Sequence, residues 1–418
     1  MKNDQFYSAA PGLAQRAPVT RKGRATYRRL LQGAQQTFRH HGYQQSSVAA
    51  ICRAARVANG TFYQYFLDKE GIFLQLVAIL QRRLILASER AISGQSGSLA
   101  KLLATHQAFL TCVAENTTLY QLFREAEFVQ MQVPRSFYRQ LAECYMQVLA
   151  EGAKRGELRV QQPQAVAYAL LGLQEFLATR WLIWEPQALR RTVVQTSIGL
   201  ITQGLAAQPE PPERLTVRPR TVPEKLSTNR PLGTRQILLG AAESLFGERG
   251  FAATSVAEIT RNAGVAQGTF YLYFPSKVAI FAQLVREINR KLIREIRQAT
   301  AGLSRRAEIE CAGFDSFFHF IRRHRAAYRI VREAEFVDEE AGQGYYRRIA
   351  AGYVKGLRRA MEAGQLRRAE PEPLAYCLMG LGHFAGLKWL VWEDLDELPP
   401  EIFRELMRLI LEGVKARS

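Results

Sequence analysis

Apolar residues recur along this chain with the period of an α-helix. They follow one another at three- and four-residue intervals in runs such as Ile72, Phe73, Leu76, Val77 and Leu80, and Phe281, Leu284, Val285 and Ile288. The alternating pattern of a half-buried strand does not compete with this spacing. Glycine and proline interrupt it often enough to divide each half of the chain into eight or nine helices. We therefore expect an all-α fold.

The pattern repeats with an offset of 208 residues, the separation of Phe66 from Phe274. The segment ANGTFYQYF at 58–66 recurs as AQGTFYLYF at 266–274, REAEFV at 124–129 recurs at 332–337, and WLIWE at 181–185 recurs as WLVWE at 389–393. A period of this length is a whole domain pair rather than a single supersecondary unit. The chain is thus a tandem duplication, and its 418 residues are too many for one hydrophobic core.

The beginning of each copy has the layout of a helix-turn-helix. In the first copy, Thr26–His40 has the apolar spacing of a helix, Gly42 ends it, and Ser46 or Ser47 can cap a second helix. The chain then turns at Arg56, and residues 60–66 supply a short aromatic third helix. The second copy repeats this layout from residue 232. Thr254 or Ser255 can cap its second helix, the chain turns at Gly264, and residues 268–274 supply its third helix.

These features predict the domain order. Residues 207–231 hold six prolines and few apolar residues, which is typical of an extended linker. We expect a basic N-terminal arm at 1–23, a first helix-turn-helix domain at 24–69, a first helical companion domain at 70–206, the linker at 207–231, a second helix-turn-helix domain at 232–277 and a second companion domain at 278–418.

Both motif regions resemble the DNA-binding signature of TetR-family regulators. The strings that carry the resemblance are VANGTFYQYF at 57–66 followed by Lys69, and VAQGTFYLYF at 265–274 followed by Lys277. The resemblance implies two tandem TetR-like units, each an N-terminal three-helix helix-turn-helix domain joined to a helical ligand-binding and dimerisation domain. It also implies sequence-specific transcriptional regulation on double-stranded DNA, with a small-molecule effector and with repression as the usual outcome.

Small and polar residues begin the third helix, where free backbone N–H groups and the positive dipole end favour phosphate. The resemblance implies that Thr61, Tyr63 and Lys69 contact phosphates and that Asn59 and Gln64 read bases. The full set of expected DNA-binding residues is Ser47, Arg56, Asn59, Gly60, Thr61, Tyr63, Gln64 and Lys69, with Ser255, Gln267, Gly268, Thr269, Tyr271 and Lys277 in the second copy. The aromatic residues expected to pack the core beneath them are Phe62, Phe66, Phe270 and Phe274.

The net charge of +19 suits a polyanionic partner such as nucleic acid, an anionic membrane or an acidic ligand. Residues 1–69 carry 11 basic and 2 acidic side chains, whereas residues 231–277 carry 4 and 3. The first motif should therefore bind phosphates more strongly. Its basic extension at 16–29 either contacts phosphate or a minor groove, or is a solvated tail, and the sequence leaves both readings open.

The two motifs also differ at the positions that should touch DNA. Arg56 occupies the turn position of Gly264, and positive φ costs a non-glycine residue about 1 kcal/mol. The arginine could weaken the first motif or add a phosphate contact. Gln64 corresponds to Leu272, and Asn59 to Gln267. The copies should therefore prefer unlike half-sites, which predicts an asymmetric operator.

The last two helices of each companion domain are the candidates for pairing, because TetR-like proteins dimerise through them. They are expected at Pro163–Glu185 with Pro186–Ala206, and at Pro371–Glu393 with Pro400–Ala416. Since both partners lie on one chain, we hypothesise an intramolecular pseudo-dimer whose recognition helices lie about 34–36 Å apart, with further oligomerisation left open.

The repeated Tyr-x-x-x-REAEF segment is the candidate ligand site, because its polar residues share a helix face. The expected ligand-binding residues are Tyr120, Arg124, Glu127 and Phe128, with Tyr328, Arg332, Glu335 and Phe336 in the second copy. Further aromatic residues could complete an apolar cavity: Phe109, Phe123, Trp181, Trp184, Phe317, Phe318, Trp389 and Trp392. Ordinary core packing or an internal salt bridge is the alternative.

Other functional classes find little support in the sequence. It contains no Gly-rich phosphate loop, His-x-x-x-His pair or nucleophile elbow, so we expect no enzyme, catalytic residue, metal or cofactor. Five scattered cysteines without a Cys-x-x-Cys pair suit a reducing cytoplasm. Glu175 and Arg180 interrupt the most apolar stretch, so we expect no membrane span or membrane partner. An architectural DNA-binding protein without an effector is the alternative function, and a helical enzyme a more remote one.

Overall fold

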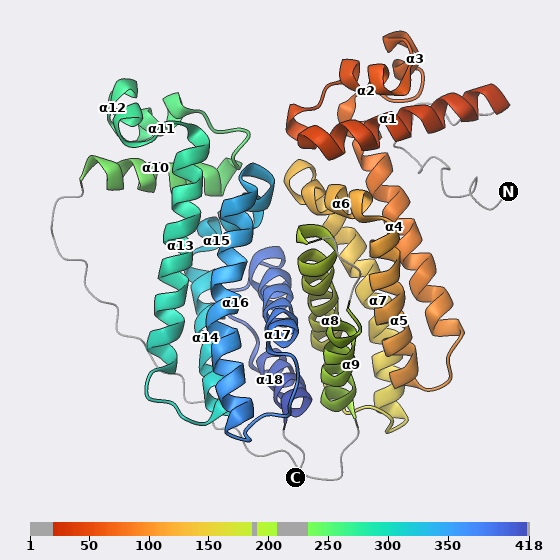
Figure 1. The fold of residues 1–418 in the computed structure, drawn as a ribbon, viewed down its shortest axis with the longest axis vertical. Helices are drawn as coiled ribbons and strands as arrows, with labels where there is room; N and C mark the ends of the chain where they lie inside the picture. Colours follow the sequence, from red (N-terminus) through yellow and green to blue (C-terminus); the bar gives the residue numbers. More distant parts are fainter. Residues whose placement is uncertain (1–19, 186–189, 207–232, 416–418) are drawn as a thin grey trace. The chain divides into compact units, whose positions relative to one another are not determined.

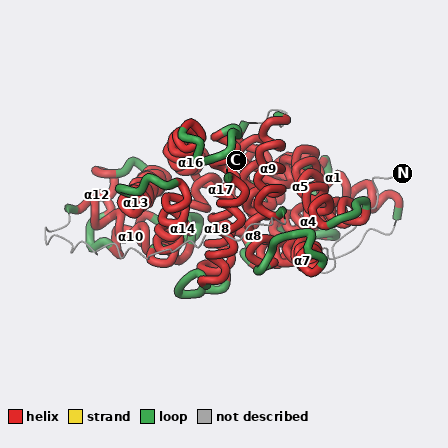
Figure 2. The backbone as a smooth tube through the Cα atoms, turned by 90° about the horizontal axis from the view of Figure 1, so that it is seen from below, coloured by secondary structure: helices red, strands yellow, loops and turns green. Residues whose placement is uncertain are grey.

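A computed structural model describes residues 20–185, 190–206 and 233–415 of the chain. Most of the arm expected at 1–23 and all of the linker expected at 207–231 lie outside these residues. Within them every named element is a helix, and extended pairing is limited to two isolated bridges (Figure 2). The all-α prediction is confirmed, with nine α-helices in each copy of the described chain.

The first helix-turn-helix domain consists of α1 (Arg21–Gln45), α2 (Val48–Ala55) and α3 (Asn59–Tyr63). Gly42 breaks the helical path near the end of α1 with φ of 65°, as its position predicts. Of the two candidate caps, Ser47 performs the role, because its side chain accepts a hydrogen bond from Ala50 N.

The second helix-turn-helix domain consists of α10 (Thr234–Arg249), α11 (Val256–Asn262) and α12 (Gln267–Tyr273). Ser255 caps α11 in a reciprocal capping box with Glu258. The predicted ends of the recognition helices were too late, since α3 stops at Tyr63 and α12 at Tyr273 rather than at the following phenylalanines. In the first copy, Tyr65 N and Phe66 N both donate to Phe62 O, so the chain closes a turn there instead of continuing as helix.

The companion domains repeat one another helix by helix (Figure 1). The first contains α4 (Lys69–Ser93), α5 (Ser98–Glu115), α6 (Thr117–Val129), α7 (Gln132–Lys154), α8 (Pro163–Ala178) and α9 (Arg191–Leu205). The second contains α13 (Lys277–Thr300), α14 (Arg306–Arg323), α15 (Arg325–Val337), α16 (Glu339–Glu362), α17 (Pro371–Ala385) and α18 (Pro400–Val414).

The repeated W-x-x-W segments have a conformation that the sequence pattern did not predict. Each is a π-helix that continues the preceding α-helix: η2 (Thr179–Trp184) follows α8, and η3 (Gly386–Trp392) follows α17. The wider turn of a π-helix is rare and changes which residues share a face. The two expected helices Pro163–Glu185 and Pro371–Glu393 are therefore α-helices that end as π-helices.

The chain divides into two compact units, Met1–Val148 with Ala178–Ala188 and Leu149–Leu177 with Leu189–Ser418. These units do not coincide with the two copies, because most of α8 and all of α9 pack with the second copy. In Figure 1 these helices lie beside α17 and α18. We call α8, α9, α17 and α18 the four-helix seam.

The seam has a reciprocal geometry. Gly172 of α8 and Gly380 of α17, which are equivalent residues, cross so closely that a Cβ on either would overlap the carbonyl oxygen of the other. A Cβ on Gly204 would lie 2.6 Å from Leu409 O, and one on its equivalent Gly413 would lie 2.8 Å from Leu200 O. Residue pairs that exchange roles in this way are the signature of a two-fold contact. The last helices are offset by one residue more than the rest of the repeat.

Two helices, Lys69–Ser93 and Pro371–Trp392, are long and apolar enough to cross a membrane by length and composition alone. Of their most apolar windows, 56% and 83% are buried within the protein. Packing of the fold therefore uses most of this apolar surface, as in core helices.

Candidate functional site

The surface of α3 presents the residues that were expected to contact DNA. Asn59, Gly60 and Gln64 are exposed, and Tyr63 is 51% exposed although it is aromatic. Thr61 is half-buried. The opposite face anchors the helix, because Phe62 and Phe66 are fully buried, as predicted.

The surface of α12 is equivalent but differs in chemistry. Gln267, Gly268 and Tyr271 are exposed and Thr269 is half-buried, while Phe270 and Phe274 are buried. Leu272, at the position of Gln64, is 81% exposed. A large apolar side chain held in water suits contact with a thymine methyl group rather than a hydrogen bond to a base edge.

Three further expected contact residues lie around the turns. Ser47 and Ser255 are exposed, and both use their side chains to cap the helix that follows. Arg56 has φ of 55° and ψ of 50°, so the left-handed conformation expected from its alignment with Gly264 is confirmed. Its side chain is exposed at the end of α2.

Lys69 and Lys277 have a positioning role that the sequence did not show. Lys69 Nζ donates to Tyr43 O at 2.7 Å and to Gln44 O at 3.3 Å, and it lies 4.2 Å from the centre of the Tyr43 ring. Lys277 Nζ donates to Phe251 O at 2.9 Å and to Thr254 O at 2.7 Å. Burial lowers the pKa of both ammonium groups. Each lysine therefore holds the turn before α2 or α11, and the phosphate contact implied by resemblance stays a prediction.

A glutamate that sequence reasoning passed over joins each DNA-binding domain to its companion domain. Glu125 Oε1 on α6 accepts a hydrogen bond from Tyr43 N at 2.9 Å. Glu333 on α15 accepts from Phe251 N through both oxygens, at 3.0 and 3.1 Å. Burial raises the pKa of both carboxyl groups, against the lowering effect of these hydrogen bonds. Both glutamates lie within the repeated REAEF segment, which was the signal that could have found them. The ligand-binding residues predicted from this segment were instead Arg124, Glu127, Arg332 and Glu335.

The second companion domain contains a cavity of about 670 Å³, within the usual range for small-molecule sites. Aromatic side chains from separate helices line one end of it. Tyr328 OH and His383 Nδ1 share a hydrogen bond of 2.6 Å, the Phe176 ring lies 5.1 Å from that of His383, and Tyr346 packs edge-on against Phe176. Its other apolar walls include Leu292, Ile296, Ile309, Phe314, Phe317 and Ile349.

A buried polar cluster forms another part of the same cavity. Arg306 Nε donates to Glu310 Oε1 at 2.8 Å, and Tyr353 OH donates to Glu310 Oε2. Burial alone would lower the pKa of Arg306, but Glu310 raises it above its ordinary value. Burial and Glu310 raise the pKa of Tyr353, so its phenol remains a donor. Within the cluster, Glu310 balances the charge of Arg306 and accepts the hydrogen bonds of both Arg306 and Tyr353.

The structure separates the expected ligand residues. Of the eight, Tyr328 lines the cavity, whereas Arg332, Glu335 and Phe336 on the same helix are half-buried outside its lining. Of the further aromatic candidates, Phe317 also lines it. In the first copy Tyr120 packs against Phe109 and Phe123 in the core, and Arg124, Glu127 and Phe128 are half-buried.

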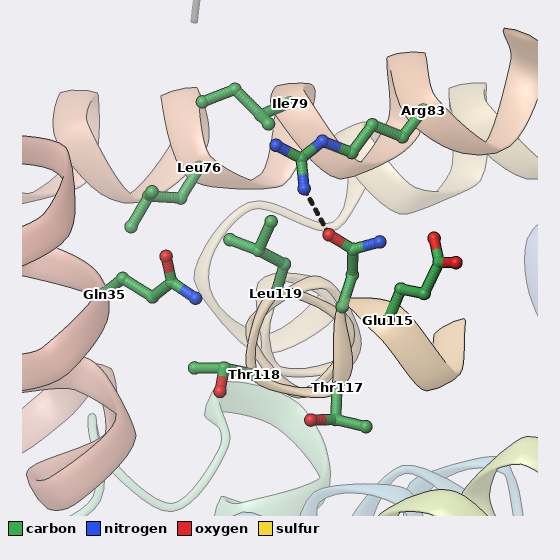
Figure 3. Close-up of a pocket in the computed structure, with 9 residues that line it drawn as sticks. Gln35, Leu76, Ile79, Arg83, Glu115, Thr117, Thr118 and Leu119 are labelled. Carbon is green, nitrogen blue, oxygen red and sulfur yellow. Dashed lines mark hydrogen bonds between the residues drawn. The ribbon is translucent and has the colours of Figure 1, made fainter. Parts of the chain in front are cut away.

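A smaller hollow of about 210 Å³ in the first copy lies between α1, α4 and the α5–α6 turn (Figure 3). Its side chains are mostly polar. Arg83 Nη1 donates to Asn116 Oδ1 across it, with Gln35 on the facing helix. None of the predicted ligand residues lines it.

The family model for the N-terminal domain of bacterial regulatory proteins of the tetR family matches the chain at residues 30–76 and 238–284. These segments contain the two recognition helices, their capping turns and the lysines described above. The chain is a tandem member of the TetR family. It is a DNA-binding transcriptional regulator in which the family's unit occurs twice.

Relatives of this TetR-family chain correspond to one copy. It is 29% identical over 189 residues to YdgC, an uncharacterised HTH-type transcriptional regulator of Bacillus subtilis, across 43% of this chain and 92% of that protein. It is 31% identical over 134 residues to the HTH-type regulator EthR of Mycobacterium tuberculosis, across 29% and 59%. A solved putative TetR-family regulator from Shewanella sp. PV-4 matches at 19% identity and TM-score 0.40, across 44% of this chain and all of that one.

Proposed function

We propose that this TetR-family chain acts as an intramolecular pseudo-dimer, a ligand-responsive cytoplasmic repressor that binds an asymmetric operator with its two unlike DNA-binding domains. The residues proposed to contact DNA are those expected from the sequence, and their exposure on α3 and α12 supports the assignment. Repression has precedent in KstR2 of Rhodococcus jostii, named a repressor and 36% identical over 91 residues, which span 22% of this chain and 45% of that protein.

The reciprocal seam is the observation that carries the proposal. Its glycine crossings bring α8 and α9 of the first copy against α17 and α18 of the second at backbone distance. The rim adds polar contacts, since Arg408 Nη1 donates to Gly204 O at 2.9 Å and Gln161 N donates to Glu405 Oε1 at 3.2 Å. In a homodimer these contacts would need a second chain. Here both partners lie in one sequence.

The seam also disfavours the pairing of two second copies. Arg367 lies against Gly199, where a Cβ would meet its guanidinium at 3.0–3.2 Å, and its Nε donates to Gly413 O at 2.9 Å. The equivalent of Gly199 in the second copy is Arg408, which pairs with buried Glu405. If two second copies met, Arg367 would face Arg408 in place of a glycine. Charge repulsion and lost space would disfavour that homotypic pair.

The contacts of α15 support ligand response over a purely architectural role. Tyr328 of this helix lines the cavity, while Glu333 and Arg329 bind the second DNA-binding domain. Arg329 Nη1 donates to Glu248 O at 2.8 Å. A ligand that favoured one position of α15 would therefore change the position of α10 and α11, and DNA affinity would change by its differential affinity for the two states.

Light scattering of the protein with and without a selected duplex tests the proposal. One chain of 47.3 kDa should be the mass of the free protein, and one chain should occupy each duplex. Two chains per duplex would contradict the pseudo-dimer. Gly199→Arg should open the seam because the new guanidinium would meet Arg367, and it should weaken binding to the full operator. Gly240→Arg, at an exposed position with open space around it, is the matched control.

A further inference from the structure

We infer that effector sensing is confined to the second copy, and that the effector is an anionic amphipath with an apolar body and a carboxylate- or phosphate-type head group. This inference rests on the proposed function and names its ligand class. The cavity residues of the second copy differ in size and charge from the residues at the same positions of the first copy.

Glycines provide much of the room in the second-copy cavity. A Cβ on Gly352 would meet no atom within 4 Å, and one on Gly313 would meet only Thr300 Cγ2 at 3.9 Å. A Cβ on Gly382 would press on the Phe314 ring at 2.6 Å, and one on Gly356 on Arg306 Nη1 at 2.8 Å. Gly352 and Gly313 therefore leave space for a ligand, and Gly382 and Gly356 leave space for the side chains of Phe314 and Arg306, which line the cavity.

The first copy replaces all four glycines with larger residues. In the order Gly313, Gly352, Gly356 and Gly382, the equivalent residues are Thr105, Cys144, Val148 and Gln174. Thr105 and Val148 are buried, at 1% and 5% exposure. Thr105 and Cys144 add side chains at positions that are open in the second copy, and Val148 and Gln174 add them where the second copy leaves room for Arg306 and Phe314. Packed interiors leave few voids larger than a water molecule.

The polar cluster is missing from the first copy as well. Ser98 replaces Arg306, and Leu102 replaces Glu310; both are buried at 2% exposure. Burying an arginine and a glutamate is costly, and in the second copy this pair borders the cavity. At these positions the first copy has a small and an apolar side chain, and the second copy has an ion pair that borders the cavity.

Basic side chains form the rim of the second-copy cavity. Arg297, Arg348, Lys355 and Arg359 all line it and are all exposed, and none has an ion-pair partner among the described residues. A neighbouring groove of about 550 Å³ shares Arg297 and Arg348 and adds Arg294. Such a rim attracts an anion, and guanidinium groups bind carboxylate and phosphate through paired N–H donors.

The rim of the first copy has the opposite charge. Glu89, Gln140, Gln147 and Glu151 occupy the positions of Arg297, Arg348, Lys355 and Arg359. An anion that approaches the second-copy rim with favourable energy would be repelled at the first. The charge difference and the volume difference thus select the same copy.

The interior of the cavity determines the rest of the ligand. Glu310 balances Arg306, and Tyr328 is bonded to His383, so these polar groups already have partners. The walls between them are aliphatic and aromatic. An apolar body is therefore expected inside, with its anionic group held at the rim.

Calorimetric titration of the full chain with decyl phosphate and with decanoate, below their micelle-forming concentrations, tests the inference. At least one of the two should bind with one molecule per chain, and comparison of the two identifies the head group. Decanol and decyltrimethylammonium should bind at least about tenfold more weakly. Two equal sites per chain, equal binding of the cation, or no binding of either anion at about 1 mM would overturn it.

Variants locate the site. The double change Arg348→Gln with Arg359→Glu introduces the first-copy residues and should weaken anion binding about tenfold or more. Arg347→Gln with Arg358→Glu changes the same charge on the same helix away from the lining and should leave binding within about twofold. Equal loss in both pairs would contradict the rim assignment.

Filling the cavity provides a second line of evidence. Gly313→Thr with Gly352→Cys transfers two first-copy residues into open space and should abolish binding of the anion while the circular dichroism spectrum and operator affinity without ligand stay unchanged. Retained binding would contradict the site. DNA binding by the ligand-free protein is measured separately, so failure of this inference is distinguishable from failure of the proposed function.

Discussion

Glu333 accepts a hydrogen bond from the backbone N–H of Phe251, and this bond joins the second companion domain to the turn that precedes helix α11. The equivalent bond in the first copy joins Glu125 to Tyr43. In both copies a lysine from the next long helix binds carbonyl groups of the same turn. The turn before the second helix is thus one point at which each companion domain holds its DNA-binding domain.

Replacement of Glu333 should uncouple the second DNA-binding domain from the cavity. Glu333→Ala leaves Phe251 N without its acceptor, at a cost of about 1–3 kcal/mol in stability. Operator affinity should fall, and the change in affinity on adding decyl phosphate should largely disappear. Fluorescence titration of labelled operator with and without the ligand measures both. Glu362→Ala, at an exposed helix end, is the control, and an unchanged ligand response in Glu333→Ala would refute the coupling.

Exchange of the two turn residues should have opposite effects on stability. Arg56→Gly removes a left-handed non-glycine residue and should stabilise the first domain by up to about 1 kcal/mol. Gly264→Arg should destabilise the second by a similar amount, since its Cβ would meet no atom within 4 Å and only backbone strain is added. Thermal unfolding of each variant decides this.

A salt titration of DNA binding by Arg56→Gly tests whether Arg56 contacts a phosphate. If Arg56 binds a phosphate, Arg56→Gly should reduce the slope of log affinity against log salt by about 1. A more stable variant with an unchanged slope would assign Arg56 no phosphate contact.

Widening of the glycine crossing should separate the copies. In Gly380→Ala the new methyl group would overlap the backbone of α8 at Gly172, and such overpacking costs typically 1–3 kcal/mol. Affinity for an operator with both half-sites should fall toward that for one half-site. Gly240→Ala adds the same methyl group in open space and should bind like the original protein. Equal affinity of both variants for the full operator would contradict the proposal that pairing through the seam holds the two DNA-binding domains on one operator.

His324 should make stability depend on pH. Burial, with the charges of Lys291 and Arg323, lowers its pKa to about 4 from 6.5, although Glu295 Oε1 lies 4.0 Å from its ring. Arg323 binds that same carboxylate at 3.1 Å. Because the unfolded chain takes up a proton below pH 6.5 and the folded chain does not, stability should be lost as pH falls from about 6.5 to 4.

Substitution by the first-copy residue isolates this effect. His324→Asn, which introduces the equivalent of Asn116, should remove a dependence on the order of 1–3 kcal/mol over that range. Chemical denaturation at several pH values gives the comparison, and an identical pH profile for the variant would show that another group is responsible.

The sequence was sufficient for features that depend on neighbouring residues. Helical spacing predicted the all-α fold, the serine positions predicted the caps, and the alignment of Arg56 with Gly264 predicted a left-handed turn. Each of these follows from local backbone chemistry. The buried face of the recognition helices was predictable for the same reason.

Features that depend on helices meeting in space could not be read in advance. The cavity draws its lining from six helices and owes its volume to absent side chains, which a periodicity pattern does not register. In the REAEF segment the predicted site residues were Arg332 and Glu335, and only the packing of α15 selects Glu333 for the turn contact. The π-helices changed the side-chain register that a period of 3.6 assumes.

Selection of bound duplexes from a random pool, with the full chain and at several salt concentrations, tests whether one chain reads an operator with its two unlike DNA-binding domains. We expect one operator with two unlike half-sites about one helical turn apart, since Gln64 and Leu272 hold equivalent positions. A perfect palindrome would contradict it, because two identical half-sites require two identical DNA-binding domains.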